Sequence, residues 1–151
     1  MKTLLLSLIV GIAFVSGAHA QHVIPLKEYF RDLKQVEVTI QGQVYNFLFD
    51  TGGGETFVSP EVAARLGYTV YGRGTAYRMN GERLSYQKMD SVAIAIGKVA
   101  FPAATVGVWD VMRLLPEGLP KVDGVLSLKT FRDKVITIDL AASQLILETP
   151  A

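Results

Sequence analysis

The chain has 151 residues, with 15 Lys and Arg against 14 Asp and Glu, two histidines and no cysteine. This composition excludes disulfides, thiolate metal clusters and Cys-His catalytic pairs. Of the two histidines, His19 lies in an N-terminal segment that we expect to be removed and His22 lies next to the resulting terminus, so a His-rich zinc site or a Ser-His-Asp triad lacks its parts. A P-loop is also absent from the sequence. The chemistry must therefore come from carboxylates, lysines and tyrosines, and we expect no cofactor and no metal.

The first twenty residues have the pattern of a signal peptide. A basic start at Lys2 precedes the apolar run 4–15, and Ala18-His19-Ala20 is typical of a cleavage site. An uncleaved anchor or an N-terminal core helix is the alternative, but the apolar run is too short to span a bilayer. We expect cleavage after Ala20, export to the periplasm or the medium, and no stable membrane anchor.

Removal of this segment takes Lys2 away, so the basic residues fall by one from 15 and equal the 14 acidic ones. A neutral domain has no overall field to attract nucleic acid. Residues 21–34 predict a polar and apolar lead-in, partly disordered, in which Pro25 argues against an early helix and His22 stands beside the new terminus. One domain is expected over residues 35–149.

Strands are predicted directly after this lead-in. Residues 36–40 alternate apolar and polar, which is the period of a half-buried strand. Gln41-Gly42 has turn chemistry, and residues 44–49 predict the partner strand. The second strand closes with an apolar run immediately before Asp50.

The remainder of the chain predicts further short strands and one or two short helices. Ser59 as N-cap and Gly67 as C-terminal cap indicate a helix between them, and Asn80-Gly81 is the strongest hairpin turn. Strand-like runs follow at residues 91–96, 99–101, 103–109, 122–126, 135–139 and 144–147, with a short helix near residues 128–131. The pattern favours an all-β fold, a small closed barrel.

The candidate chemistry lies at Asp50-Thr51-Gly52. A carboxylate at the end of an apolar strand is costly unless it is hydrogen-bonded or functional. Glycines 52–54 allow backbone N–H groups to approach that carboxylate closely. An ordinary Asp-Thr-Gly turn without function is the alternative, because Asp and Gly are common in turns.

The segment 36–60, with Phe49-Asp50-Thr51-Gly52 near its centre, resembles the opening hairpin and active-site loop of retropepsin-like aspartic proteases of the exported bacterial single-domain type. The likeness continues through residues 61–67 and returns at residues 122–128, Phe131 and residues 135–139. Two positions depart from the family pattern. Gly53 stands where Ala or Ser is usual, and Ser127 replaces a glycine.

The resemblance implies an all-β retropepsin-like barrel and an aspartic endopeptidase, a hydrolase that acts on peptides or proteins. Asp50 would be the catalytic acid and base, and the single Asp-Thr-Gly would require a homodimer. Thr51, Gly52 and Gly53 would support the active-site loop. Asn80-Gly81 would form the tip of a flap that closes over the substrate.

Two other functions remain open. In the second hypothesis the same fold serves, without catalysis, as an exported binding or assembly module in which Asp50 only shapes the loop. A lipid or small-ligand binding barrel is the third hypothesis, and it leaves Asp50-Thr51-Gly52 unexplained. The oligomeric state separates the first two hypotheses, because a strict monomer cannot pair two Asp50 side chains.

Overall fold

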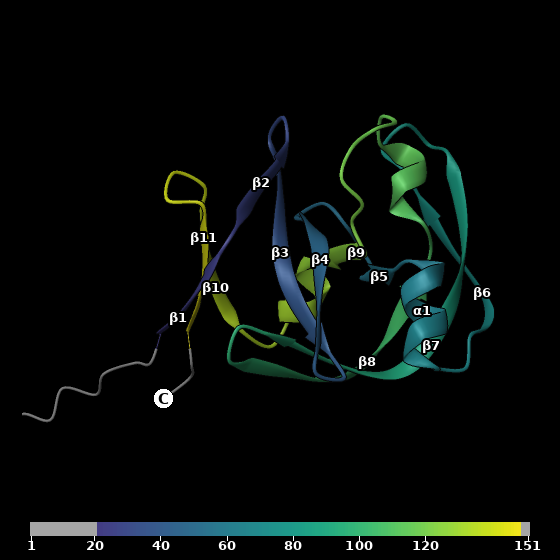
Figure 1. The fold of residues 1–151 in the computed structure, drawn as a ribbon, viewed down its shortest axis with the longest axis horizontal. Helices are drawn as coiled ribbons and strands as arrows, with labels where there is room; N and C mark the ends of the chain where they lie inside the picture. The colour runs from purple at the N-terminus through teal and green to yellow at the C-terminus, as the bar shows by residue number, and fades with distance from the viewer. Residues whose placement is uncertain (1–20, 149–151) are drawn as a thin grey trace, which may run out of the picture.

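Most of the chain is in β-strands, and the computed structural model describes residues 21–148 (Figure 1). The elements in chain order are β1 (Gln21–Pro25), β2 (Lys27–Phe30), β3 (Leu33–Ile40), β4 (Gln43–Asp50), β5 (Phe57–Val58), α1 (Pro60–Leu66), β6 (Tyr71–Tyr77), β7 (Arg83–Ile96), β8 (Val99–Val108), η1 (Val111–Leu114), β9 (Gly124–Ser127), η2 (Leu128–Phe131), β10 (Val135–Asp139) and β11 (Gln144–Glu148).

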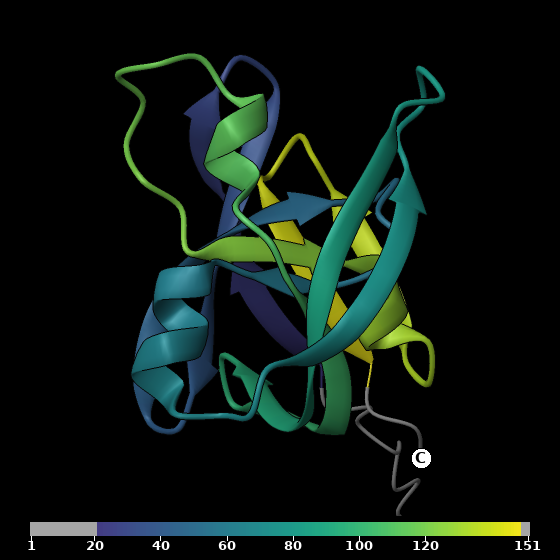
Figure 2. The same cartoon turned by 90° about the vertical axis from the view of Figure 1, so that its right-hand side faces the viewer.

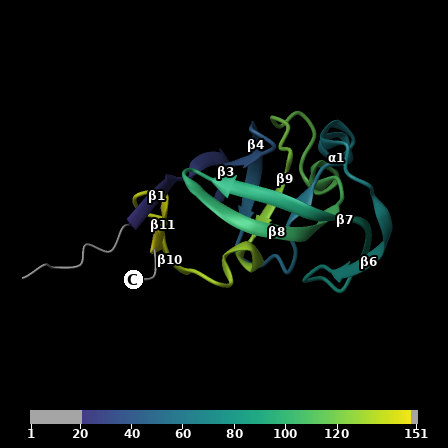
Figure 3. The same cartoon turned by 90° about the horizontal axis from the view of Figure 1, so that it is seen from below.

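The described strands form two sheets. The larger has the order β2-β3-β4-β9-β5-β8-β7-β6, and a further pairing of Thr39 in β3 with Ala95 in β7 closes its middle into a ring. The smaller sheet, β1-β11-β10, stands at the opposite end of the molecule from α1 and β6 (Figure 1). The long strands β7 and β8 run along the underside (Figure 3). The expected all-β barrel with short helices is confirmed.

Strand β4 runs through the interior between two apolar clusters. Phe47 and Phe49 on one face belong to the main core, whereas Leu48 on the other face packs in a second cluster with Val125. A strand buried on both faces needs a continuous apolar run, and this explains why the alternation of β3 is lost in β4. Its parallel partner β9 has the same property, because all its residues are buried.

Gly124 allows β9 to fit between its two neighbours. A Cβ atom at this position would lie 2.2 Å from the backbone oxygen of Phe57 in β5 and 2.8 Å from the ring of Phe47 in β4. The first of these atoms belongs to the backbone and cannot move aside cheaply. The close approach of three strands therefore depends on a residue without a side chain.

Helix α1 has the predicted boundaries. The Ser59 Oγ accepts a hydrogen bond from the backbone N–H of Val62, and Pro60 occupies the first helical position. Gly67 ends the helix in the left-handed conformation with φ of 71°. No helix within residues 21–148 is long and apolar enough to cross a membrane.

The partly disordered lead-in expected over residues 21–34 was wrong, and so was the domain start at residue 35. Residues 21–25 form β1, paired antiparallel with β11 at the other end of the chain, and residues 27–30 form β2 against β3. Ile24 and Leu26 are buried in the main core. Pro25 is tolerated because β1 is an edge strand, where a missing N–H costs no ladder bond.

Replacement of Ile24 tests whether β1 belongs to the folded unit. Ile24 is 4% exposed, so Ile24→Ala should lower the free energy of unfolding by about 2–5 kcal/mol through lost burial and a residual cavity. The neighbouring Val23 is 58% exposed, and Val23→Ala should change the same quantity by less than about 0.5 kcal/mol. Urea denaturation of both variants measures the difference. Equal effects would show that β1 does not contribute to the core.

Candidate active site

Asp50 is the last residue of β4, and its side chain is exposed although the residues before it are buried. Because side chains alternate along a strand, Asp50 lies on the same face of β4 as Leu48, which belongs to the second apolar cluster. The backbone N–H of Gly52 donates a hydrogen bond of 2.9 Å to Asp50 Oδ1. The chain therefore turns sharply after β4, and the turn orients the carboxylate.

The far end of this loop is fastened at Thr56. Its Oγ1 accepts from the N–H of Ser127 at 3.1 Å and lies 3.2 Å from Ser127 Oγ and 2.8 Å from Thr130 Oγ1. A hydroxyl has one donor and two acceptor positions, so these three partners fill its capacity. The Thr56 carbonyl also accepts from the N–H of Gly107 at 2.9 Å. Residues 51–55 thus bridge two fixed points.

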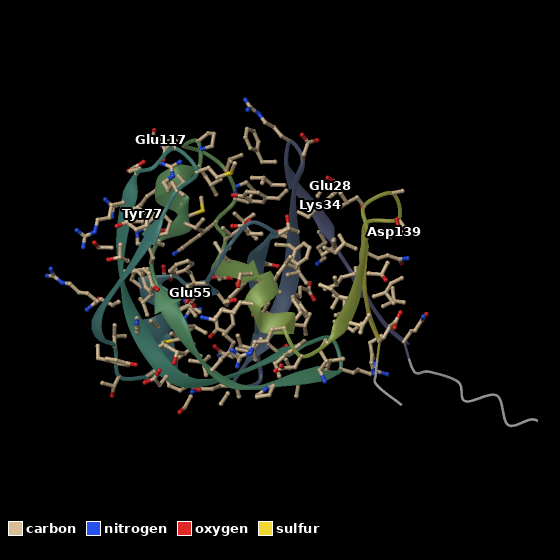
Figure 4. All side chains as sticks on the ribbon, turned by 180° about the vertical axis from the view of Figure 1, so that it is seen from behind. Glu28, Lys34, Glu55, Tyr77, Glu117 and Asp139 are labelled. Carbon is tan, nitrogen blue, oxygen red and sulfur yellow. The ribbon has the colours of Figure 1, made fainter. Side chains whose placement is uncertain are left out.

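One exposed ion pair ties the loop to η2. Glu55 carries a carboxylate oxygen 2.7 Å from Lys129 Nζ, and both side chains keep part of their surface in solvent. Glu55 lies beside η2 when the molecule is seen from behind (Figure 4). A partly exposed pair of this kind contributes little to stability, about 1 kcal/mol at most. Its effect is to orient the loop.

The face of β4 that carries Asp50 also carries Leu48 of the second apolar cluster. Leu48 and Val125 are covered by residues of η1 and by the half-buried Trp109. The ring of Phe57 packs edge to face on Tyr86 at 5.0 Å and on Trp109 at 6.4 Å. Burial raises the pKa of the Tyr86 hydroxyl, and the charge of Glu55 adds to the rise.

The hairpin of β6 and β7 places Asn80 and Gly81 at its exposed tip, as the sequence predicts. Asn80 Oδ1 accepts from the N–H of Glu82, and the N–H of Gly81 donates to the carbonyl of Arg78. The hairpin extends away from the body of the molecule (Figure 2). Within residues 21–148, no hydrogen bond joins this tip to the Asp50 loop.

Asp90 holds the base of the same hairpin, and sequence analysis missed this residue. Its carboxylate accepts from the hydroxyls of Thr105 in β8 and Tyr71 in β6. The Thr105 bond, then the Tyr71 bond, and the nearby charge of Lys88 lower the pKa of Asp90. The only local signal was an Asp-Ser pair that interrupts the alternation of a long strand, where Ser91 has φ of 59°.

Asp123 has a structural role that differs from the candidate catalytic role of Asp50. Its Oδ2 accepts from the N–H of Asn46 at 2.9 Å, and its own N–H donates to the Asn46 carbonyl at 2.7 Å. Both bonds support β4. Among the described residues, no group of three or more His, Cys, Asp or Glu side chains could hold a metal ion.

A cavity of about 340 Å³ lies behind the loop, between β8 and η2. Glu55, Thr56 and Lys129 contribute to its lining, but Asp50 does not. The exposed Asp50 carboxylate and this cavity therefore lie apart, and the cavity does not enclose the candidate catalytic group.

Comparisons with known proteins place this geometry in a family. The family model for aspartyl proteases matches residues 36–130, more than half of the chain. Among solved structures, the chain is similar to a retropepsin-like aspartic protease from Rickettsia conorii, with a TM-score of 0.55 and 19% identity, and the match covers 85% of this chain and 89% of that one. A search of curated proteins gives no match. The retropepsin type of the predicted barrel is confirmed.

The Thr56 hydroxyl should be essential to the loop. Thr56→Val keeps the shape of the side chain but leaves the buried N–H of Ser127 without its acceptor. We expect the free energy of unfolding to fall by about 1–3 kcal/mol. Thr137→Val, at an exposed position in β10, is the matched control and should change it by less than about 0.5 kcal/mol. If chemical denaturation finds the two variants equal, the hydroxyl does not fasten the loop.

Asp90 should stabilise the hairpin base in a pH-dependent way. Its folded-state pKa lies below the ordinary 3.8, so its contribution is complete above the unfolded-state pKa and is lost as pH falls through the folded-state pKa. The melting temperature of Asp90→Asn should therefore lie below that of the wild type above about pH 5, and the difference should shrink on further acidification. Tyr71→Phe should reproduce part of the loss, because it removes one donor. A difference that stays constant with pH would contradict this role.

Proposed function

The chain belongs to the aspartyl protease family, and we propose that it is an endopeptidase active as a homodimer, with one Asp50 from each subunit. The observation that carries the proposal is the exposed Asp50 carboxylate, oriented by the Gly52 N–H at the end of a buried strand. A charged group presented in this way on a rigid element is suited to acid–base chemistry.

The proposed reaction uses a pair of carboxylates around one water molecule. One carboxylate takes a proton from the water, whose oxygen attacks the carbonyl carbon of the peptide, and the other carboxyl group protonates the carbonyl oxygen. The C–N bond of the tetrahedral intermediate then breaks as the leaving nitrogen takes a proton from the pair. Two carboxylates at close range cannot both ionise, so the pair shares one proton and titrates as a unit. The apolar face formed by the second cluster would exclude bulk water around the pair.

A second subunit supplies the second carboxylate in this proposal. The sequence contains a single Asp-Thr-Gly, and the carboxylate of Asp123 is engaged by Asn46. Asp50 and Thr51 are both exposed in one subunit, as a two-fold contact at this loop would require. Thr51 would then hydrogen-bond across the axis and hold the two loops together.

The hairpin tip at Asn80-Gly81 is proposed as a flap that closes over a bound peptide. Its residues are exposed, and its base is fixed at Asp90. Within the described residues, its tip makes no hydrogen bond to the Asp50 loop. A hairpin fixed at one end can move as a lid. The substrate is accordingly proposed to be a peptide or protein.

Export is part of the proposal as well. The signal-peptide pattern over residues 1–20 lies outside the described residues and supports release of a protein that begins at Gln21. A periplasmic or secreted location would follow, with no membrane anchor after cleavage.

Replacement of Asp50 tests the proposed function directly. Asp50→Asn and Asp50→Ala should lower the rate of hydrolysis of a mixed peptide library by at least about 10²–10⁴-fold, since the carboxylate is the acid and base. Asp133→Asn, at a side chain 75% exposed, is the matched control and should keep wild-type activity. Mass spectrometry of the products gives the rates.

The same assay decides between the homodimer and the alternative function. Activity per subunit should rise with protein concentration around the dimer dissociation constant, because a monomer carries only half of the pair. A protein that sediments as a monomer and cleaves no peptide at any concentration would favour the non-catalytic binding or assembly module.

A further inference from the structure

The space beside the Asp50 carboxylate is limited by two other residues, Gly53 of the loop and Ser127 of β9. A Cβ atom at position 53 would lie 2.9 Å from Asp50 Oδ2, 3.2 Å from Asp50 Cγ and 3.4 Å from Ser127 Cβ. Gly53 is absent from the residues with positive φ. Its backbone conformation is therefore open to any residue, and a side chain at position 53 is restricted by its close approach to the Asp50 carboxylate.

Ser127 limits this space on the side away from the Asp50 carboxylate. It pairs with Asp50 in the parallel register of β4 and β9, so the two side chains stand next to each other on one face. Its exposed fraction is 0%, and its N–H and Oγ both bond to Thr56 Oγ1. Strand pairing and the Thr56 hydroxyl hold Ser127 in place, and its Cβ atom cannot retreat.

The Asp50 carboxylate is the part of this arrangement that can move. It is exposed, and its hydrogen bond within the described chain is the one that Oδ1 accepts from Gly52. A methyl group at position 53 would be pressed between a fixed Cβ on one side and a mobile carboxylate on the other. The carboxylate would rotate and lose its alignment with the Gly52 N–H.

We propose that Gly53 and Ser127 act as a matched pair of positioning residues for Asp50. There is room for one side chain behind the carboxylate, and that side chain is Ser127. Glycine at position 53 allows the carboxylate to keep its hydrogen bond with the Gly52 N–H. The effect on catalysis rests on the proposed function, whereas the effect on the geometry of the loop does not. The pair has a specific consequence: the damage from a larger residue at position 53 depends on the side chain at position 127.

Gly54 provides the matched control. A Cβ atom there would meet nothing within 4 Å, and Gly54 also lacks a positive φ. Gly54→Ala makes the same chemical change as Gly53→Ala one residue further along the loop. Any general effect of stiffening this loop appears in both variants, and only Gly53→Ala crowds Asp50.

The experiment measures Gly53→Ala in the wild type, in the Ser127→Gly background and in the Ser127→Ala background. Steady-state kinetics on a peptide cleaved by the wild type give kcat and KM. The NMR chemical shift of the Gly52 amide proton reports its hydrogen bond to Asp50 without any need for catalysis. Thermal unfolding shows whether each variant is folded.

In the wild type, Gly53→Ala should lower kcat by about tenfold to a hundredfold through misplacement of the carboxylate. KM should stay within about threefold, and the Gly52 amide resonance should shift. Gly54→Ala should leave kcat within about twofold. In the Ser127→Gly background, most of the loss should disappear, because the methyl group at position 53 can occupy the vacated space. The Ser127→Ala background should give no rescue, because its Cβ remains.

Three results would overturn the proposal: equal effects of Gly53→Ala and Gly54→Ala, no rescue by Ser127→Gly, or equal rescue by Ser127→Ala. If Gly53→Ala does not fold, recovery of folding by Ser127→Gly but not by Ser127→Ala supports the pair, and the reverse contradicts it. A wild-type protein that cleaves no peptide would refute the proposed function alone. The Gly52 amide shifts would then still decide whether the pair positions Asp50.

Discussion

The parallel pairing of β4 with β9 is the constraint on which the candidate site depends. Both strands are buried on both faces, between the main core and the smaller second cluster. A shift of register by one residue would exchange Phe47 and Phe49 with Leu48 between these two clusters. The register is therefore fixed, and it sets Asp50 beside Ser127 at the point where burial ends. The position of the carboxylate follows from packing far more than from its own interactions.

The site combines one rigid part with one exposed part. The Asp50 loop is held at Gly52, at Thr56 and by the ion pair of Glu55 with Lys129. The β6–β7 hairpin is instead pinned at its base by Asp90 and is exposed at its tip. A loop fastened in this way and a hairpin pinned at its base agree with the proposed roles of an active-site loop and a moving flap.

The described chain presents the candidate catalytic group in an open setting. Its carboxylate is exposed, and the cavity behind the loop does not include it. Completion by a second copy would bring the two Asp50 side chains together and cover the loop, which links the proposed activity to the proposed assembly. Where the chain departs from its family pattern, at Gly53 and Ser127, the two departures meet in space beside Asp50.

Local features of the sequence determined the β3–β4 hairpin, the caps of α1 at Ser59 and Gly67, the Asn80-Gly81 turn and the glycine-rich loop after Asp50, because strand period, capping and turn geometry are set by neighbouring residues. Tertiary structure alone decided that residues 21–30 join the sheets, since β1 pairs with β11 from the opposite end of the chain. It also brought Asp90 to Tyr71 and Thr105, and Ser127 to Gly53. These contacts join segments that are distant in sequence. Burial and the space available between side chains determine such contacts, and local backbone preferences cannot.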